Sequence, residues 1–224
     1  MIFGYRIESI QQVEDDYLDT QYEIIDKIGY GAFSTVYSAR HKEQGYICAV
    51  KQIGNWLSLH IYILICIDKA LVPKVQRITN EVRFYQLFSQ QIDNEDQEST
   101  DDTNISRFIA RHYSVPVQTT KYVFIFMEYY SKGDLHNFWM QKQGLMEVDS
   151  KYVLRNLIEI AQLLHEKGVV LRDIKPENWV IDNQGYLRLI DFNHWGFLED
   201  SEDGLFHEVV GTIGYMSPEV LTAK

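Results

Sequence analysis

The stretch "VVLRDIKPENWVID", residues 169–182, places a cluster of polar side chains between two apolar segments. Asp173, Lys175 and Asn178 stand within six positions, and the apolar chain resumes at once at Trp179. A second apolar run, "YLRLIDF" (186–192), follows the turn letters "NQG" and contains Asp191. A short polar turn with glycine between two such runs predicts a hairpin. An acid, a base and an amide would then gather at one end of a small sheet.

This grouping has a chemical meaning. Carboxylate and amide oxygens from Asn178 and Asp191 would suit a hard cation, and Asp173 would lie beside it. Such an arrangement suits activation of a hydroxyl group next to a metal-bound phosphate. From these residues alone, a polar turn with capping side chains is the plainer alternative.

Composition and charge exclude several classes of protein. The 224 residues carry a net charge of −11, which argues against a nucleic-acid binder and against docking on anionic membrane lipid. The apolar segment 56–67 is shorter than the ~20 residues of a spanning helix. Cys48 and Cys66 form no disulfide framework, and the first residues lack the apolar core of a signal peptide. We therefore expect a cytoplasmic protein.

The apolar pattern changes along the chain. It predicts strands within 22–53 and at 122–130, and a helix at 77–91. Residues 93–104 read as an acidic solvated loop. Residues 149–168 form an amphipathic helix, with Asp149 or Ser150 as its cap and Gly168 at its end. This order predicts an α+β protein of two lobes that join near 128–133.

Five motifs, in order, resemble those of eukaryotic protein kinases. "LRDIKPEN" (171–178) resembles the catalytic loop, and "DFN" (191–193) resembles the metal-binding Asp-Phe-Gly triplet. "GYGAFSTV" (29–36) is similar to the glycine-rich loop, and "AVK" (49–51) is similar to the strand that carries the phosphate-anchoring lysine. "GTIGYMSPE" (211–219) is similar to the end of the activation segment. The lysine two positions after Asp173 is typical of the Ser/Thr type.

The resemblance covers residues 22–224 and implies a two-lobed kinase-like fold. It places a β-rich N-lobe at 22–128 and a partial α-helical C-lobe at 129–224, after a lead-in at 1–21. The implied activity is transfer of the γ-phosphate of ATP to Ser or Thr hydroxyls of a protein substrate. The nearest groups are the calcium/calmodulin-dependent-like and autophagy-initiating kinases.

The resemblance also implies a set of site residues. Asp173, Lys175, Lys51 and Glu81 would be catalytic, and Asn178 and Asp191 would hold Mg²⁺. Residues for ATP binding are Ile28, Gly29, Tyr30, Gly31, Ala32, Phe33, Ser34, Val36, Ala49, Lys51, Met127, Glu128, Tyr130, Asp134 and Val180. Each feature alone has a plainer interpretation, namely a hairpin turn for the glycines, a surface carboxylate for Glu81 and ordinary core for the apolar residues.

Several positions depart from the family pattern. Ser34 replaces the third glycine of the loop, Leu171 replaces a histidine, and Asn193 replaces the glycine of the triplet. Asn tolerates positive φ, so the turn at Asn193 can persist. The resemblance also implies regulatory roles for Arg172, Glu208 and Thr212. Where the family carries a phosphorylated residue ahead of Thr212, this chain has Glu208. We expect Glu208 to pair with Arg172 and partly replace that phosphate, although a solvated loop glutamate is the plainer alternative.

Two further features bear on the whole chain. Lys51 and Glu81 lie further apart than in the family, and the excess coincides with residues 54–66, "GNWLSLHIYILIC". This segment is either a non-native insert, such as a retained intron, or a genuine apolar insertion. The sequence also ends soon after Glu219, so the resemblance implies an incomplete helical lobe. The alternative to an active kinase is therefore a pseudokinase or an inactive fragment that binds nucleotide or a partner.

Overall fold

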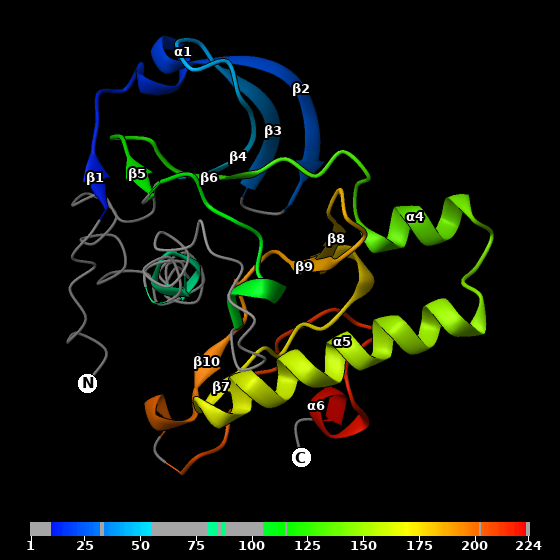
Figure 1. The fold of residues 1–224 in the computed structure, drawn as a ribbon. Helices are drawn as coiled ribbons and strands as arrows, with labels where there is room; N and C mark the ends of the chain where they lie inside the picture. The colour runs from blue at the N-terminus through cyan, green and yellow to red at the C-terminus, as the bar shows by residue number, and fades with distance from the viewer. Residues whose placement is uncertain are drawn as a thin grey trace. The chain divides into compact units, whose positions relative to one another are not determined.

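The computed structural model of the protein describes residues 10–31, 34–54, 80–84, 87, 105–114, 116–201 and 203–222. The chain divides into two compact units (Figure 1). The first unit contains Met1–Glu95 and Arg111–Tyr129, and the second contains Asp96–Ala110 and Tyr130–Lys224. The α+β fold class is confirmed, because the first unit is built on a sheet and the second carries long helical segments.

A curved sheet forms the first unit (Figure 1). Its strands in the described part of the chain are β1 (Gln11–Gln12), β2 (Tyr22–Tyr30), β3 (Ser34–His41), β4 (Ile47–Gly54), β5 (Val117–Gln118) and β6 (Tyr122–Glu128). They lie in the order β1-β5-β6-β4-β3-β2, and only the β1–β5 pair is parallel. The predicted strands within 22–53 and at 122–130 are thus confirmed.

The centre of this sheet is apolar and buried. Residues 123–127 of β6 are all buried, which fits a strand covered on both faces. Phe126 stacks on Tyr22 with ring centroids 4.7 Å apart. Cys48 lies in the same cluster as a free thiol, and burial raises its pKa to about 11. This packing holds β4, which carries Lys51, within the buried core of the unit.

The segment predicted as a lead-in contributes to this core. β1 pairs with β5, and the helix α1 (Tyr17–Gln21) leads directly into β2. Val13, Tyr17 and Leu18 pack against the buried cluster that contains Phe126. Residues 10–21 are therefore part of the first unit's packing rather than an appendage.

The second unit combines helices with two small two-stranded sheets. Its described helices are η2 (Ile105–Phe108), α4 (Leu135–Gln141), α5 (Glu147–Glu166), η3 (Pro176–Asn178), η4 (Leu198–Asp200) and α6 (Pro218–Thr222). Its strands are β7 (Val169–Val170), β8 (Trp179–Ile181), β9 (Leu187–Leu189) and β10 (Gly196–Phe197). β8 and β9 pair antiparallel, which confirms the predicted hairpin.

The boundaries of α5 differ from the prediction at one end. The helix begins at Glu147, after Met146, so Asp149 and Ser150 lie inside its first turn and the predicted cap is wrong. Asp149 instead adds negative charge to the first turn, where the helix dipole favours it. Gly168 ends the helix as predicted: its φ is +70°, and its N–H donates to the carbonyl of His165 at 2.8 Å.

Residues 105–110 belong to the second unit, whereas the sequence assigned all of 22–128 to the N-lobe. The reason is a pairing with the hairpin. Ile109 forms a bridge with Leu189, and the amide of Ala110 donates to the carbonyl of Leu189 at 3.0 Å. The strand β9, which ends two residues before Asp191, is thereby held on a second side.

Other predictions fall on parts of the chain that the structure does not describe. The acidic loop 93–104 and residues 55–66 of the unusual segment lie outside the described residues. Gly54, the first residue of that segment, is the last residue of β4 and pairs with Tyr122. Among the helices that the structure describes, none has both the length and the apolar character that crossing a bilayer requires.

Candidate functional site

The polar loop of the second unit connects β7 to β8. Arg172 adopts a positive φ of 63°, and residues 176–178 form the short helix η3. The N–H of Ile190 donates to the carbonyl of Asn178 at 2.8 Å. Because Asp191 follows Ile190 directly, this bond brings the end of β9 to the polar loop. The predicted gathering of Asp173, Lys175, Asn178 and Asp191 therefore occurs within one unit.

Asp173 is the centre of a closed network of polar contacts. The hydroxyl of Thr212 donates to Asp173 Oδ1 at 2.8 Å, and the ammonium of Lys175 lies 3.0 Å from Asp173 Oδ2. Lys175 also donates to the Thr212 hydroxyl at 2.9 Å. Thr212, which the sequence suggested only as regulatory, thus joins the two residues predicted to be catalytic.

The charge state of Asp173 follows from its neighbours. Burial alone would raise the pKa of this carboxyl group. Contacts with His194, Thr212 and Lys175 outweigh burial and hold the pKa of Asp173 well below its ordinary value. Asp173 is accordingly an ionised carboxylate at neutral pH, and it can accept a hydrogen bond from a hydroxyl group.

Asn178 and Asp191 offer the oxygen atoms that a hard cation prefers. The amide nitrogen of buried Asn178 donates to the carbonyl of Asp173 at 2.9 Å, which assigns its side-chain oxygen as the atom that could bind a cation. Asp191 has a φ of +64°, and its Oδ1 accepts a hydrogen bond from the side chain of Asn193.

This donor set fits Mg²⁺, which usually binds one or two carboxylates together with water and substrate phosphates. Among the described residues, no three His, Cys, Asp or Glu side chains form a cluster that could hold a metal. Two oxygen donors together with an incoming phosphate fit the coordination chemistry of Mg²⁺.

Arg172 connects the polar loop to the segment that precedes Thr212. Its Nη1 lies 3.3 Å from Glu208 Oε2, so the predicted contact is present. Its guanidinium carbon lies 4.3 Å from the centroid of the Phe206 ring, which the sequence did not single out. Burial lowers the pKa of Arg172, and Glu208 partly opposes that shift. Whether Glu208 replaces a phosphate stays a prediction.

His194 is a second residue that the sequence analysis missed. Its Nδ1 lies 3.6 Å from Asp173 Oδ2, and its carbonyl accepts a hydrogen bond from Arg172 Nε at 2.6 Å. No motif marks this position. Its only signal in the sequence is a titratable side chain three residues after Asp191.

The first unit contains a buried ion pair. Lys51 lies on β4, and Glu81 lies in the helical residues 80–84. Lys51 Nζ is 2.5 Å from Glu81 Oε1, and the two side chains are 7% and 1% exposed. A buried lysine that contacts a carboxylate keeps its positive charge, and the contact fixes the direction in which the side chain points. The long interval between these residues has not displaced Glu81 from Lys51.

The glycine-rich segment lies where β2 and β3, two strands that pair antiparallel, follow one another in the chain. Gly29 pairs with Val36, and the N–H of Gly31 donates to the carbonyl of Ser34 at 2.8 Å. A Cβ atom at Gly29 would lie 3.3 Å from Val36 Cβ, so glycine permits close packing of the strands there. Ala32 and Phe33 lie outside the described residues.

The remaining residues predicted to bind ATP are divided between the units. In the first unit, Ala49 and Met127 are buried partners on β4 and β6, and Glu128 ends β6. Ile28 and Tyr30 on β2 are exposed.

In the second unit, Tyr130 and Val180 are buried in one cluster with Ala110. Asp134 accepts a hydrogen bond from the N–H of Asn137 at 2.7 Å and caps α4, a structural role that the sequence analysis did not foresee. Its predicted contact with ribose stays a prediction.

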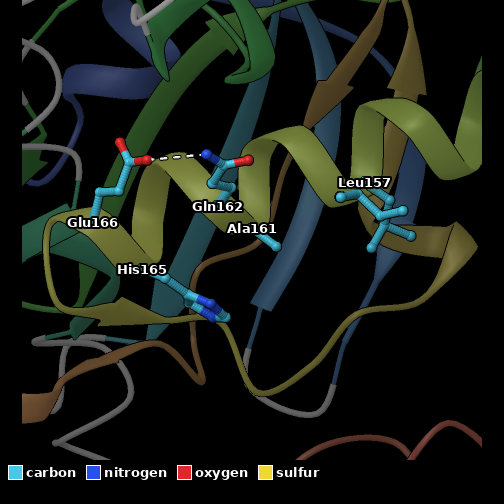
Figure 2. Close-up of a pocket in the computed structure, with 6 residues that line it drawn as sticks. Leu157, Ala161, Gln162, His165 and Glu166 are labelled. Carbon is cyan, nitrogen blue, oxygen red and sulfur yellow. Dashed lines mark hydrogen bonds between the residues drawn. The ribbon is translucent and has the colours of Figure 1, made fainter.

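A hollow along α5 differs in character from the polar loop. Figure 2 shows it lined by Leu157, Ala161, Gln162, His165 and Glu166. The side-chain amide of Gln162 donates a hydrogen bond to the carboxylate of Glu166 at 3.1 Å, one helical turn further along α5. No residue predicted for catalysis or binding lines it, so the polar loop remains the candidate site.

Comparison with known proteins agrees with the site. A family model described as a protein kinase domain matches residues 22–224. The chain is 27% identical over 206 residues to the liver/testis isoform of the phosphorylase b kinase gamma catalytic chain of Homo sapiens, covering 90% of this chain and 44% of that protein.

Two other relatives match this chain with similar identity and coverage. The calcium/calmodulin-dependent protein kinase type 1 of Caenorhabditis briggsae is 29% identical over 206 residues, or 91% of this chain and 49% of that protein. The serine/threonine-protein kinase cds1 of Schizosaccharomyces pombe is 31% identical over 213 residues, or 92% of this chain and 39% of that protein. The chain thus spans less than half the length of these relatives.

Proposed function

Because the chain belongs to the protein kinase family, we propose that it transfers the γ-phosphate of ATP to serine or threonine hydroxyls of a protein substrate. The observation that carries this proposal is the network of Asp173, Lys175 and Thr212 in the second unit. It joins an ionised carboxylate to a cation, the two groups that phosphoryl transfer to a hydroxyl requires. The curated relatives named above carry kinase names as well.

The proton of the substrate hydroxyl goes to Asp173. As the hydroxyl oxygen bonds to the γ-phosphorus, the bond between that phosphorus and the bridging oxygen of the β-phosphate breaks, and ADP leaves. The carboxylate orients the hydroxyl and accepts its proton during this step. Thr212 supports the role because its hydrogen bond fixes one oxygen of Asp173 and so limits rotation of the carboxylate.

Lys175 would stabilise negative charge on the transferring phosphoryl group. Its ammonium already lies 3.0 Å from Asp173, so a group that reacts at Asp173 is within its reach. A fixed cation that faces developing charge lowers the barrier without reorganising in the reaction. The overall charge of −11 makes such local cations necessary for binding an anionic nucleotide.

Asn178 and Asp191 would hold Mg²⁺ by their side-chain oxygens. The metal, when bound, neutralises charge on the phosphates of ATP. Asn193 supports this arrangement because its amide donates to one oxygen of Asp191 and orients the carboxylate.

In the first unit, Lys51 would bind the α- and β-phosphates of ATP, and Glu81 would orient it. Ala49 and Met127 offer apolar surface for the adenine ring, together with Ile28 and Val36. In the second unit, Val180 offers apolar surface of the same kind.

The acidic chain and the absence of a basic motif support a protein substrate rather than nucleic acid as the partner. A cytoplasmic location is part of the proposal, supported by the buried thiol of Cys48.

The proposal is tested with the purified chain, Mg²⁺, radiolabelled ATP and a peptide library that contains Ser, Thr and Tyr acceptors. We expect label on Ser or Thr, and a loss of about 10²- to 10⁴-fold in kcat for Asp173→Asn. Glu166→Gln, at an exposed carboxylate on α5, is the matched control and should keep the wild-type rate. Nucleotide binding with equal, negligible transfer by the wild type and Asp173→Asn would instead support the pseudokinase alternative.

A further inference from the structure

His194 lies close to the carboxylate on which the proposed reaction depends. It occupies the segment between Asp191 and β10, and its Nδ1 is 3.6 Å from Asp173 Oδ2. The His194 side chain is 19% exposed and that of Asp173 is 7% exposed. This distance exceeds that of a hydrogen bond, so the contact is electrostatic and depends on the charge of the imidazole. Partial burial limits the screening of that contact by water.

The backbone holds His194 in this place. Arg172, the residue before Asp173, donates from Nε to the carbonyl of His194 at 2.6 Å. The same guanidinium contacts Glu208 and the ring of Phe206. The position of the imidazole relative to Asp173 is therefore set by the polar loop itself.

We propose that His194 is a positioning residue of the phosphotransfer site, whose imidazole acts on the reaction through the Oδ2 atom of Asp173. This inference rests on the proposed kinase function. It adds a residue that none of the five motifs contains.

The charged groups around the imidazole determine the direction of the effect. Asp173 faces it directly, Lys175 contacts the same carboxylate oxygen, and Arg172 contacts its carbonyl, with Glu208 on the far side of Arg172. A protonated imidazole adds a second cation at Oδ2. That attraction is lost when Asp173 accepts the proton of the substrate, so the protonated form of His194 makes Asp173 a weaker proton acceptor.

Histidine changes its charge between about pH 5 and pH 8. We therefore expect the wild-type kcat to rise about three- to tenfold across this range, with one ionisation. His194→Gln keeps a polar side chain without this ionisation, and its kcat should vary by less than about twofold over the same range. The KM for ATP should be unchanged, because the effect passes through Asp173 and not through the nucleotide.

His165→Gln is the matched control, because His165 is an exposed histidine on α5. It should keep the wild-type pH profile. A His194→Gln variant with the wild-type profile, or with kcat lowered by the same factor at every pH, would overturn the proposal, since the second result indicates a purely structural role.

A second measurement does not depend on catalysis. The ring resonances of His194, followed by NMR at one fixed pH, should move in Asp173→Asn relative to the wild type, because the side chain that the imidazole faces has lost its charge. Unchanged resonances would overturn the contact and the proposal. Absence of phosphotransfer by the wild type at every pH, with the NMR shift present, would instead overturn the proposed kinase function alone.

Discussion

Lys51 and Glu81 form a buried ion pair across 30 residues of chain, with Nζ 2.5 Å from Oε1. The strand β4 supplies the lysine from the buried centre of the sheet, and the helical residues 80–84 supply the carboxylate. Both side chains are almost wholly shielded from solvent. A pair of this kind constrains the first unit, because neither charge can remain buried without compensation.

Removal of the lysine should therefore destabilise the first unit strongly. Lys51→Met leaves the Glu81 charge without its cationic partner, and we expect the free energy of unfolding to fall by about 3–5 kcal/mol. Urea denaturation in the absence of nucleotide measures this change, because it separates stability from any loss of phosphate binding.

The double variant Lys51→Met with Glu81→Leu is the control. It removes both charges at once, so it should recover most of the stability that the single variant loses. If the double variant were no more stable than Lys51→Met, the ion pair would not be the reason for the loss.

Local patterns in the sequence predicted the elements around Lys51 and the polar loop well. The alternation before Lys51 predicted β4, and the turn "NQG" predicted the β8–β9 hairpin that brings Asp191 to Asn178. These patterns report on neighbouring residues, and neighbouring residues decide strand and hairpin formation. The grouping of Asp173, Lys175 and Asn178 followed from their spacing in one short loop.

Contacts between distant residues were not predictable in the same way. β1 is two residues long and pairs with a strand more than a hundred residues away, so residues 10–21 appeared to be only a lead-in. The contact of His194 with Asp173 depends on the path of a loop that has no periodic pattern. Asp149 looked like a helix cap, but α5 begins earlier, because its acidic first turn suits the helix terminus without a side-chain cap.

Glu208 should influence activity through Arg172. Its side chain is 66% exposed, so the pair is worth no more than about 1 kcal/mol, and we expect Glu208→Gln to lower kcat about two- to fivefold. Added salt should bring the wild type towards the variant, because salt screens an exposed pair. Initial rates at low and high ionic strength measure both effects.

Glu199→Gln provides a control at another exposed glutamate. It changes the net charge equally and should leave the rate and its dependence on salt as in the wild type. Equal rates for Glu208→Gln and the wild type at low salt would contradict a role for this contact in activity.

Asn193 should affect the binding of Mg²⁺. Its amide donates to the Oδ1 atom of Asp191, and loss of a group that orients a metal ligand typically weakens metal binding. For Asn193→Ala we expect the Mg²⁺ concentration that gives half-maximal activity to rise about tenfold. Titration with Mn²⁺ followed by electron paramagnetic resonance, with ADP present, reports the affinity directly.

Asn156→Ala removes an amide from the exposed face of α5 and serves as the control. It should bind the metal as the wild type does. A wild-type metal affinity in Asn193→Ala would show that the hydrogen bond to Asp191 does not help to orient the ligand.

His112 should make the first unit sensitive to acid. Its backbone forms an antiparallel β-bridge with Met127, and burial of the side chain lowers the pKa of His112 to about 3. An unfolded chain exposes this histidine to water, where its pKa is about 6.5. Between these two values the unfolded state binds one more proton than the folded state, so the free energy of unfolding falls as the pH drops below about 6.5.

The expected loss from this residue is about 2 kcal/mol between pH 7 and pH 5. Thermal or urea unfolding of His112→Gln at both pH values should show a smaller loss than the wild type by about that amount, whatever the variant's stability at pH 7. His165→Gln, which removes an exposed histidine, should keep the wild-type dependence on pH. If His112→Gln lost as much stability on acidification as the wild type, proton uptake by this histidine could not be the cause, because the variant has no imidazole at position 112 to charge.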